Sequence, residues 1–191
     1  MEKFEIDNFN EYQNSHYVLY NQDEFTANES QCNWIKSVCW FNDGTKLELK
    51  IYNGAYFYPF FRLNRFLMLY INDPNFIPPD NMIIYNSDGS IFKKVPVPHF
   101  NHPQTKDEIQ KYLKPNKMKG TDVHPSFYSI GTLEDIERKK YLTIHITEPV
   151  IFKYSHYYEE RALDIESGEW HPSWSIFHSP LGNQGWGESF K

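Results

Sequence analysis

The chain has 191 residues and a formal net charge of −6 at neutral pH, enough length for one well-buried domain and the wrong overall charge for binding polyanions. Aromatic residues make up 18% of the sequence, so the core can be aromatic rather than leucine-rich. No stretch approaches the roughly 18 uncharged apolar residues of a membrane-spanning helix. The first residues also lack the basic and apolar regions of a signal peptide.

Residues 1–30 predict an acidic N-terminal arm, because they carry seven acidic residues against a single lysine and are rich in Asn and Gln. Residues 31–191 predict a single β-rich globular domain. Cys32 and Cys39 are the only cysteines, and an extended segment of this length holds them beyond disulfide reach. Two free thiols and the missing signal peptide favour a cytoplasmic location.

Residues 34–60 predict a three-stranded antiparallel meander. Residues 47–51 alternate between apolar and charged side chains, which is the period-two pattern of a half-buried strand. The turn sequences Asn-Asp-Gly at residues 42–44 and Asn-Gly at residues 53–54 lie on either side of this strand.

Residues 65–71 (RFLMLYI) form a continuous apolar run of strand length, which predicts a central strand. Residues 80–98 (DNMIIYNSDGSIFKKVPVP) predict a hairpin. Two strand-like runs flank Ser87-Asp88-Gly89, and the glycine can supply the positive φ that a tight turn needs.

Residues 106–113 predict a short helix. Thr105 is the expected N-cap, and Asp107 and Glu108 in the first turn suit the helix dipole. Pro115 ends the helix. The last third returns to strand patterns at residues 141–146, 161–165 and 170–177. The sequence therefore predicts an α+β, β-rich fold of antiparallel meander sheets with one short edge helix.

Catalytic signatures are weak in this chain. No serine lies in a G-x-S-x-G turn, and Cys39 falls in an apolar strand-like run where burial raises the pKa of a thiol. His99 and His102 form an H-x-x-H pair that His124 or His171 could complete as a metal site. The segment lacks the helix and the glutamate of the common metalloprotease motif. A small metal-dependent enzyme is thus an alternative, and no cofactor is expected.

Residues 93–119 form the one basic block, with seven lysines against two acidic residues. Lysines interleaved with aromatic residues suit a nucleic-acid-associated module, which is a second alternative. The absence of arginine in this block and the overall negative charge count against it.

A protein-binding module is the preferred interpretation. Acidic segments rich in Tyr and Trp supply large contact area and steer a basic partner. Neighbouring residues on a strand point to opposite faces, so two adjacent glutamates can share one face only at a bulge. The candidate partner-binding residues lie on one predicted hairpin: Glu159, Glu160, Asp164, Glu166, Glu169 and Trp170.

Two runs, PDNMIIYNSDGSIFKKVPVP and HYYEERALDIESGEWHPSW, resemble hairpins of orphan bacterial proteins that are encoded beside polymorphic or contact-dependent toxins. They cover about a fifth of the chain, and they are hairpin-forming motifs that carry no binding residues across. The resemblance implies a cognate immunity protein, which neutralises one toxin by occluding its active site. A basic toxin domain is the partner expected for this acidic chain.

Overall fold

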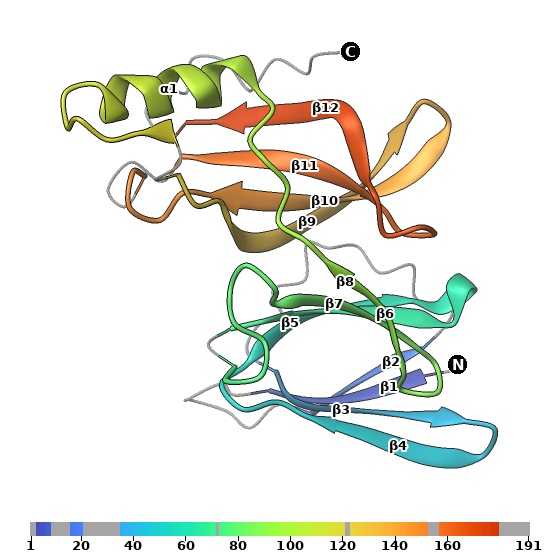
Figure 1. Cartoon of the computed structure of the whole chain (residues 1–191). Helices are drawn as coiled ribbons and strands as arrows, with labels where there is room; N and C mark the ends of the chain where they lie inside the picture. Colours follow the sequence, from blue (N-terminus) through green and yellow to red (C-terminus); the bar gives the residue numbers. More distant parts are fainter. Residues whose placement is uncertain are drawn as a thin grey trace. The chain divides into compact units, whose positions relative to one another are not determined.

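The structure is a computed structural model that describes residues 3–8, 16–20, 35–71, 73–120, 123–152 and 157–179. The chain divides into two compact units, Met1–Pro96 and Val97–Lys191 (Figure 1). The described strands are antiparallel, and the structure has a single α-helix among these residues. The predicted β-rich α+β fold is therefore confirmed.

Unit 1 contains two four-stranded sheets, with the strand orders β2-β1-β3-β4 and β5-β6-β7-β8. A 3₁₀ turn, η2 (Phe61–Leu63), connects β5 to β6. The strands of the first sheet are β1 (Lys3–Asn8), β2 (His16–Tyr20), β3 (Ile35–Asn42) and β4 (Thr45–Lys50). Those of the second sheet are β5 (Ala55–Phe60), β6 (Arg65–Tyr70), β7 (Met82–Asn86) and β8 (Ile91–Val95).

Aromatic side chains from both sheets form the core of unit 1. The Phe4 ring lies 4.9 Å from that of Phe57, and the Trp40 ring lies 4.9 Å from that of Phe66, both in edge-to-face geometry. Such ring pairs add to the free energy gained by burying the rings. Trp40 also donates its indole N–H to the carbonyl oxygen of Ser87 at 2.6 Å. The aromatic core expected from composition is thus built between two sheets.

The organisation of the chain differs from the predicted arm and single domain. Strand β1 lies within residues 1–30, and Phe4 and Ile6 of this strand are almost fully buried. Burial of these two apolar side chains joins the strand to β3 and to the core. The boundary between the two units also falls inside residues 31–191, which were predicted to form one domain.

The predicted meander is correct in its strands and wrong in its pairing. Strands β3 and β4 pair with each other, but β5 begins the second sheet and pairs with β6. Gly54, with a φ of 101°, redirects the chain between Ile51 and Ala55, which are both buried in the same core. Strand β6 is central as predicted, and the β7–β8 hairpin turns at Gly89 with a φ of 83°.

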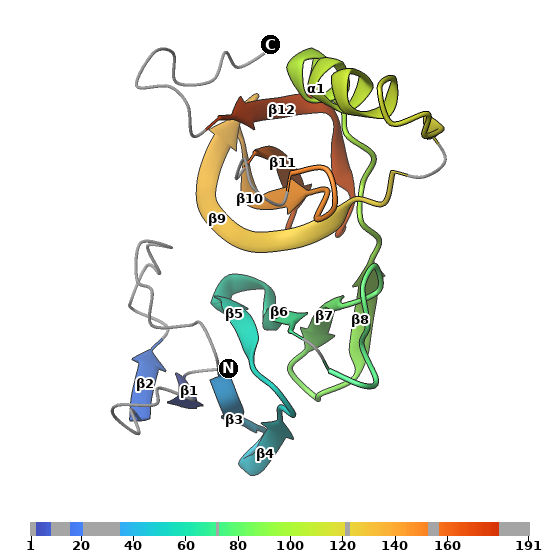
Figure 2. The ribbon, with the colours of Figure 1, turned by 90° about the vertical axis from the view of Figure 1, so that its left-hand side faces the viewer.

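Unit 2 is a four-stranded sheet with one helix, and its strand order is β12-β11-β10-β9. Strand β9 follows a wide arc (Figure 2), and two shifts in its register with β10 mark bulges, which bend a strand. The elements are α1 (Pro103–Leu113), β9 (Ser126–Ile136), β10 (Lys139–Thr147), β11 (Tyr158–Asp164) and β12 (Trp170–His178). The sequence pattern does not predict β9, because bulges interrupt the period of two.

The predicted helix exists, but it begins earlier and has a different cap. Helix α1 starts at Pro103, and the ring Nδ1 of His102 accepts the backbone N–H of Gln104 at 3.2 Å. Thr105, the predicted cap, is a buried residue inside the helix, and the first turn contains no acidic residue. Proline at the first helical position explains the early start. The helix packs Ile109 and Leu113 into a cluster with Ile146, Phe100 and Phe152.

Phe66 provides a test of the aromatic core of unit 1. This side chain is fully buried and contacts the rings of Phe4, Trp40 and Tyr85. We expect Phe66→Ala to lower the free energy of unfolding by about 3–5 kcal/mol, because it removes buried area and leaves a cavity. Phe41→Ala, at an exposed position in β3, should change it by less than about 1 kcal/mol. Urea denaturation followed by tryptophan fluorescence measures both, and equal costs would contradict the proposed core.

Candidate functional site

The hairpin that carries the predicted partner-binding residues forms as expected between β11 and β12, with Gly168 at a φ of 69°. Its acidic residues do not share one surface, however. Glu159 is fully buried, Asp164 is mostly buried, and Glu160 points to the opposite face of the sheet from Glu159. The strand has no bulge between residues 159 and 160 that would bring these two side chains together.

Glu159 is a structural carboxylate beneath the start of the helix. It accepts the backbone N–H groups of Asn101 and His102 at 2.8 and 3.1 Å, and its Oε1 lies 3.6 Å from Nη1 of Arg161. The Arg161 guanidinium in turn donates to the carbonyl oxygens of His99, His171 and Trp174. The ion pair is therefore saturated by backbone groups, as a buried pair must be to persist.

The remaining predicted residues lie at or near the β11–β12 turn. Asp164 accepts from the Ser167 hydroxyl and the Glu166 backbone N–H and pairs with Lys139 at 2.7 Å, so it holds the turn in shape. Burial opposes its ionisation, but the bonds from Lys139 and Ser167 outweigh burial and lower the pKa of this carboxyl. Glu166 and Glu169 are exposed, and Trp170 is half-buried with its ring 6.2 Å from that of Phe127.

Glu160 lies at the centre of a polar cluster on the other face of the sheet. Its Oε2 is 2.9 Å from Nε2 of His178, and its Oε1 is 3.7 Å from Nε2 of His145. Burial by itself would raise the pKa of Glu160, but its polar contacts with His145, His178 and Thr143 outweigh burial and hold the pKa far below its usual range. The cluster therefore contains a carboxylate that is ionised at neutral pH.

Ser129 extends this cluster onto strand β9. Its hydroxyl lies 2.7 Å from Nδ1 of His145, and the strand register places Ser129, His145 and Glu160 directly opposite one another on β9, β10 and β11. We call these three residues the row. The absence of a side chain at Gly131 leaves space beside them. A Cβ on Gly131 would lie 2.2 Å from the Thr143 hydroxyl and 3.0 Å from Nε2 of His145.

Aromatic rings lie beside the cluster. The Tyr158 ring stacks on that of His178 at 4.4 Å and lies 4.6 Å from that of His145. Tyr128, which is 52% exposed, stacks on Tyr158 at 6.0 Å. Burial, together with the charge of Glu160, raises the pKa of Tyr158, so the phenol stays neutral.

Sequence reasoning identified Glu160 but missed Ser129, His145 and His178. Together with Glu160, these residues lie 15 to 49 positions apart in the sequence, and the four meet only because three strand pairs fix their register. Alternation within single strands carried a partial signal, since Ser129 and His145 are polar residues that lie between apolar neighbours. The bulges in β9 concealed which of its residues share a face.

The histidines of the metal hypothesis are not brought together as ligands. Nδ1 of His102 caps the helix, and Nδ1 of His171 accepts the backbone N–H groups of Ser173 and Trp174. His99 and His124 are both exposed. Throughout the described ranges, no three His, Cys, Asp or Glu side chains form a group that could hold a metal ion.

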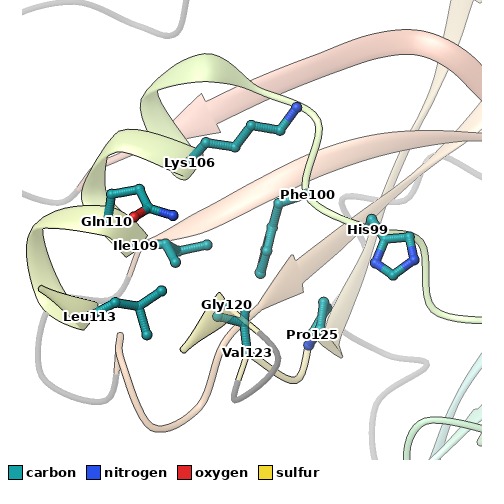
Figure 3. A pocket seen from close by; sticks show the side chains of 9 residues that line it. All are labelled: His99, Phe100, Lys106, Ile109, Gln110, Leu113, Gly120, Val123 and Pro125. Carbon is teal, nitrogen blue, oxygen red and sulfur yellow. The ribbon is translucent and has the colours of Figure 1, made fainter. Parts of the chain in front are cut away.

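Two hollows lie outside the polar cluster. The first, of about 410 Å³, is lined by helix α1 and the segments beside it. Figure 3 shows Ile109 and Leu113 pointing from the helix toward Phe100, with Lys106 and His99 near the rim. The second, of about 990 Å³, is an open polar hollow in unit 1 between the turns near Asp43 and Asp88. Neither hollow is lined by Ser129, His145 or Glu160.

Unit 2 thus defines a class of site: an ionised carboxylate held by two imidazoles on a sheet face, with a serine hydroxyl at one end. Comparison of the chain with protein-family models, with curated proteins and with solved structures found no match. Within the described part of the chain, no helix has the length and hydrophobicity needed to cross a bilayer.

Arg161 tests the role of the buried ion pair. We expect Arg161→Ala to cost about 3–5 kcal/mol of unfolding free energy, because it leaves Glu159 charged and uncompensated. Replacing both residues, as Glu159→Gln with Arg161→Ala, should cost less than the sum of the two single changes. Urea denaturation of the native chain, the two single variants and the double variant gives the coupling energy between the two residues. Arg138→Ala, at an exposed position, serves as a control. Additive costs would contradict a paired role.

Glu160 predicts a pH dependence of stability. Its pKa is lower in the folded chain than the ordinary value of 4.5, so its contribution is complete above about pH 4.5 and is lost as the pH falls below that value. We expect Glu160→Gln to be less stable than the native chain at pH 7 by about 1–3 kcal/mol and to lose stability less steeply in acid. Glu166→Gln, at an exposed position, should keep the native slope in urea titrations between pH 7 and pH 3.

Proposed function

We propose that this chain acts by binding: it is an immunity protein that neutralises a basic toxin domain by occluding the toxin's active site. Inhibition of this kind requires no catalysis by the chain. The proposal rests on one observation, namely that two hairpin turns of unit 2 carry exposed carboxylates at the same end of the sheet.

The antiparallel order of the strands produces this arrangement. The β9–β10 turn and the β11–β12 turn both lie at the end where Tyr141 pairs with Asp164. The contact of 3.9 Å between Glu137 and His171 shows that the two hairpins meet there. Five exposed carboxylates lie on the two hairpins, on Glu134, Asp135, Glu137, Glu166 and Glu169. We call these five residues the acidic end.

The acidic end supports an interaction with a basic protein. The side chains of Glu137 and Glu166 are 80% and 66% exposed, so a partner can reach them without any rearrangement. Three cationic residues, Arg138, Lys139 and Lys140, lie among them. Lys139 pairs with the buried Asp164 at 2.7 Å and more loosely with Glu166 at 3.7 Å. A surplus of exposed negative charge accelerates the encounter with a positive surface.

The sequence-based set of binding residues changes accordingly. Glu166 and Glu169 remain in the proposed surface, and Glu137 joins them from the neighbouring hairpin. Glu159 and Asp164 leave it because they are buried and hold structure together, and Glu160 leaves it because it belongs to the polar cluster on the sheet face.

Charge reversal at the acidic end tests the proposal. The protein encoded beside this gene is expressed as the candidate toxin, and growth is measured with and without this chain. We expect native chain to restore growth, and Glu137→Lys/Glu166→Lys/Glu169→Lys to lose protection and to bind at least tenfold more slowly.

The matched control changes the same charge elsewhere, as Glu48→Lys/Asp80→Lys/Asp107→Lys at exposed positions. This control should protect as native chain does. Full protection by the variant of the acidic end would contradict the assigned surface, and a neighbouring protein that is inert or unaffected by the native chain would contradict the function.

A further inference from the structure

The row Ser129, His145 and Glu160 has the parts of an activated nucleophile. A hydroxyl lies 2.7 Å from an imidazole nitrogen, and the other nitrogen of that ring faces an ionised carboxylate at 3.7 Å. A nucleophile within hydrogen-bond reach of a base, and a base oriented by a third group, is the arrangement by which proteins activate serine. The proposed binding function makes no use of this row.

The carboxylate decides which nitrogen of His145 is free. A proton on Nε2 faces Oε1 of Glu160, whereas a proton on Nδ1 would leave Nε2 as a lone pair beside negative charge. The tautomer with the proton on Nε2 is therefore favoured. Nδ1 is then an acceptor, and it is the atom that the Ser129 hydroxyl contacts.

The second imidazole and the neighbouring strand hold this geometry in place. His178 fixes the other oxygen of Glu160 at 2.9 Å, so the carboxylate keeps its position toward His145. Gly131 leaves the space into which the His145 ring and the Thr143 hydroxyl fit. The three-part row is thus supported from β9, β10 and β12.

We propose that Ser129 is a reactive serine that accepts acyl groups from aryl esters. Ser129 Oγ bonds to the ester carbonyl carbon as its proton passes to Nδ1 of His145. The bond from that carbon to the aryl oxygen then breaks, and the departing phenolate takes the proton from His145. The products are an acylated Ser129 and a free phenol, with no oxidant or further reactant.

The aromatic surroundings favour aryl esters over other acyl donors. Tyr128 is 52% exposed and stacks on Tyr158, which itself lies 4.6 Å from the His145 ring. An aromatic leaving group can lie against such rings in offset-stacked geometry. A register shift leaves Tyr128 between the paired residues Phe127 and Ser129. The Tyr128 ring therefore lies over Tyr158, on the side of the His145 ring, and a planar ester can approach the half-buried Ser129 from there.

The test uses p-nitrophenyl acetate and the full chain. We expect release of nitrophenolate together with a gain of one acetyl group in the intact mass, and peptide mapping should locate that group on Ser129. Ser129→Ala should lose this adduct, while Ser173→Ala, at an exposed serine of the same unit, should acquire it at the native rate. Mapping on the native chain gives an answer even where a variant fails to fold.

His145→Ala separates catalysis by the imidazole from mere support. We expect acetylation of Ser129 to slow by about a hundredfold or more, and added imidazole to restore much of the rate, which a purely structural role would not allow. Thermal unfolding checks that the variant folds. An adduct spread over lysines with none on Ser129, or equal rates in native chain and Ser129→Ala, would overturn the proposal.

This reactivity and the proposed inhibition can fail independently. Ser129→Ala leaves the acidic end unchanged, so it should still protect cells that express the neighbouring protein. The charge-reversed variant in turn keeps the row and should acetylate at the native rate.

Discussion

The buried ion pair between Glu159 and Arg161 determines where the polar groups of β11 can lie. Both side chains face the helix, where backbone groups of the preceding segment and of β12 saturate them. Because side chains alternate along a strand, Glu160 between them must face the opposite side. The polar cluster around Glu160 is thus a geometric consequence of where its two neighbours are buried.

Two adjacent carboxylates are therefore stabilised by different means. Glu159 is held by two backbone N–H groups and a permanently charged guanidinium. Glu160 is held by two imidazoles and a hydroxyl, and an imidazole nitrogen can either donate or accept a hydrogen bond. The first arrangement suits a fixed structural joint, and the second suits a site where a proton can move.

The sequence predicted individual strands and turns better than it predicted which strands pair and which side chains meet. The β7–β8 and β11–β12 hairpins followed from their glycine turns, and the central strand β6 followed from its apolar run. The predicted pairing between β4 and β5 was wrong, because the chain turns at Gly54 and β5 enters the second sheet. Within the site, adjacent glutamates could be assigned to opposite faces from alternation alone. The contacts among Ser129, His145 and His178 could not be predicted in this way, because they depend on register and bulges across four strands.

The segment that precedes the helix is held by side chains rather than by a ladder of strand hydrogen bonds. The carbonyl oxygen of His99 and the N–H groups of Asn101 and His102 all depend on Glu159 and Arg161. This segment can therefore open without breaking the sheet, as a small cooperative unit of its own. Amide hydrogens of residues 101 and 102 would then exchange with solvent sooner than those of β11, and the helix would lose its fixed starting point whenever the segment opened.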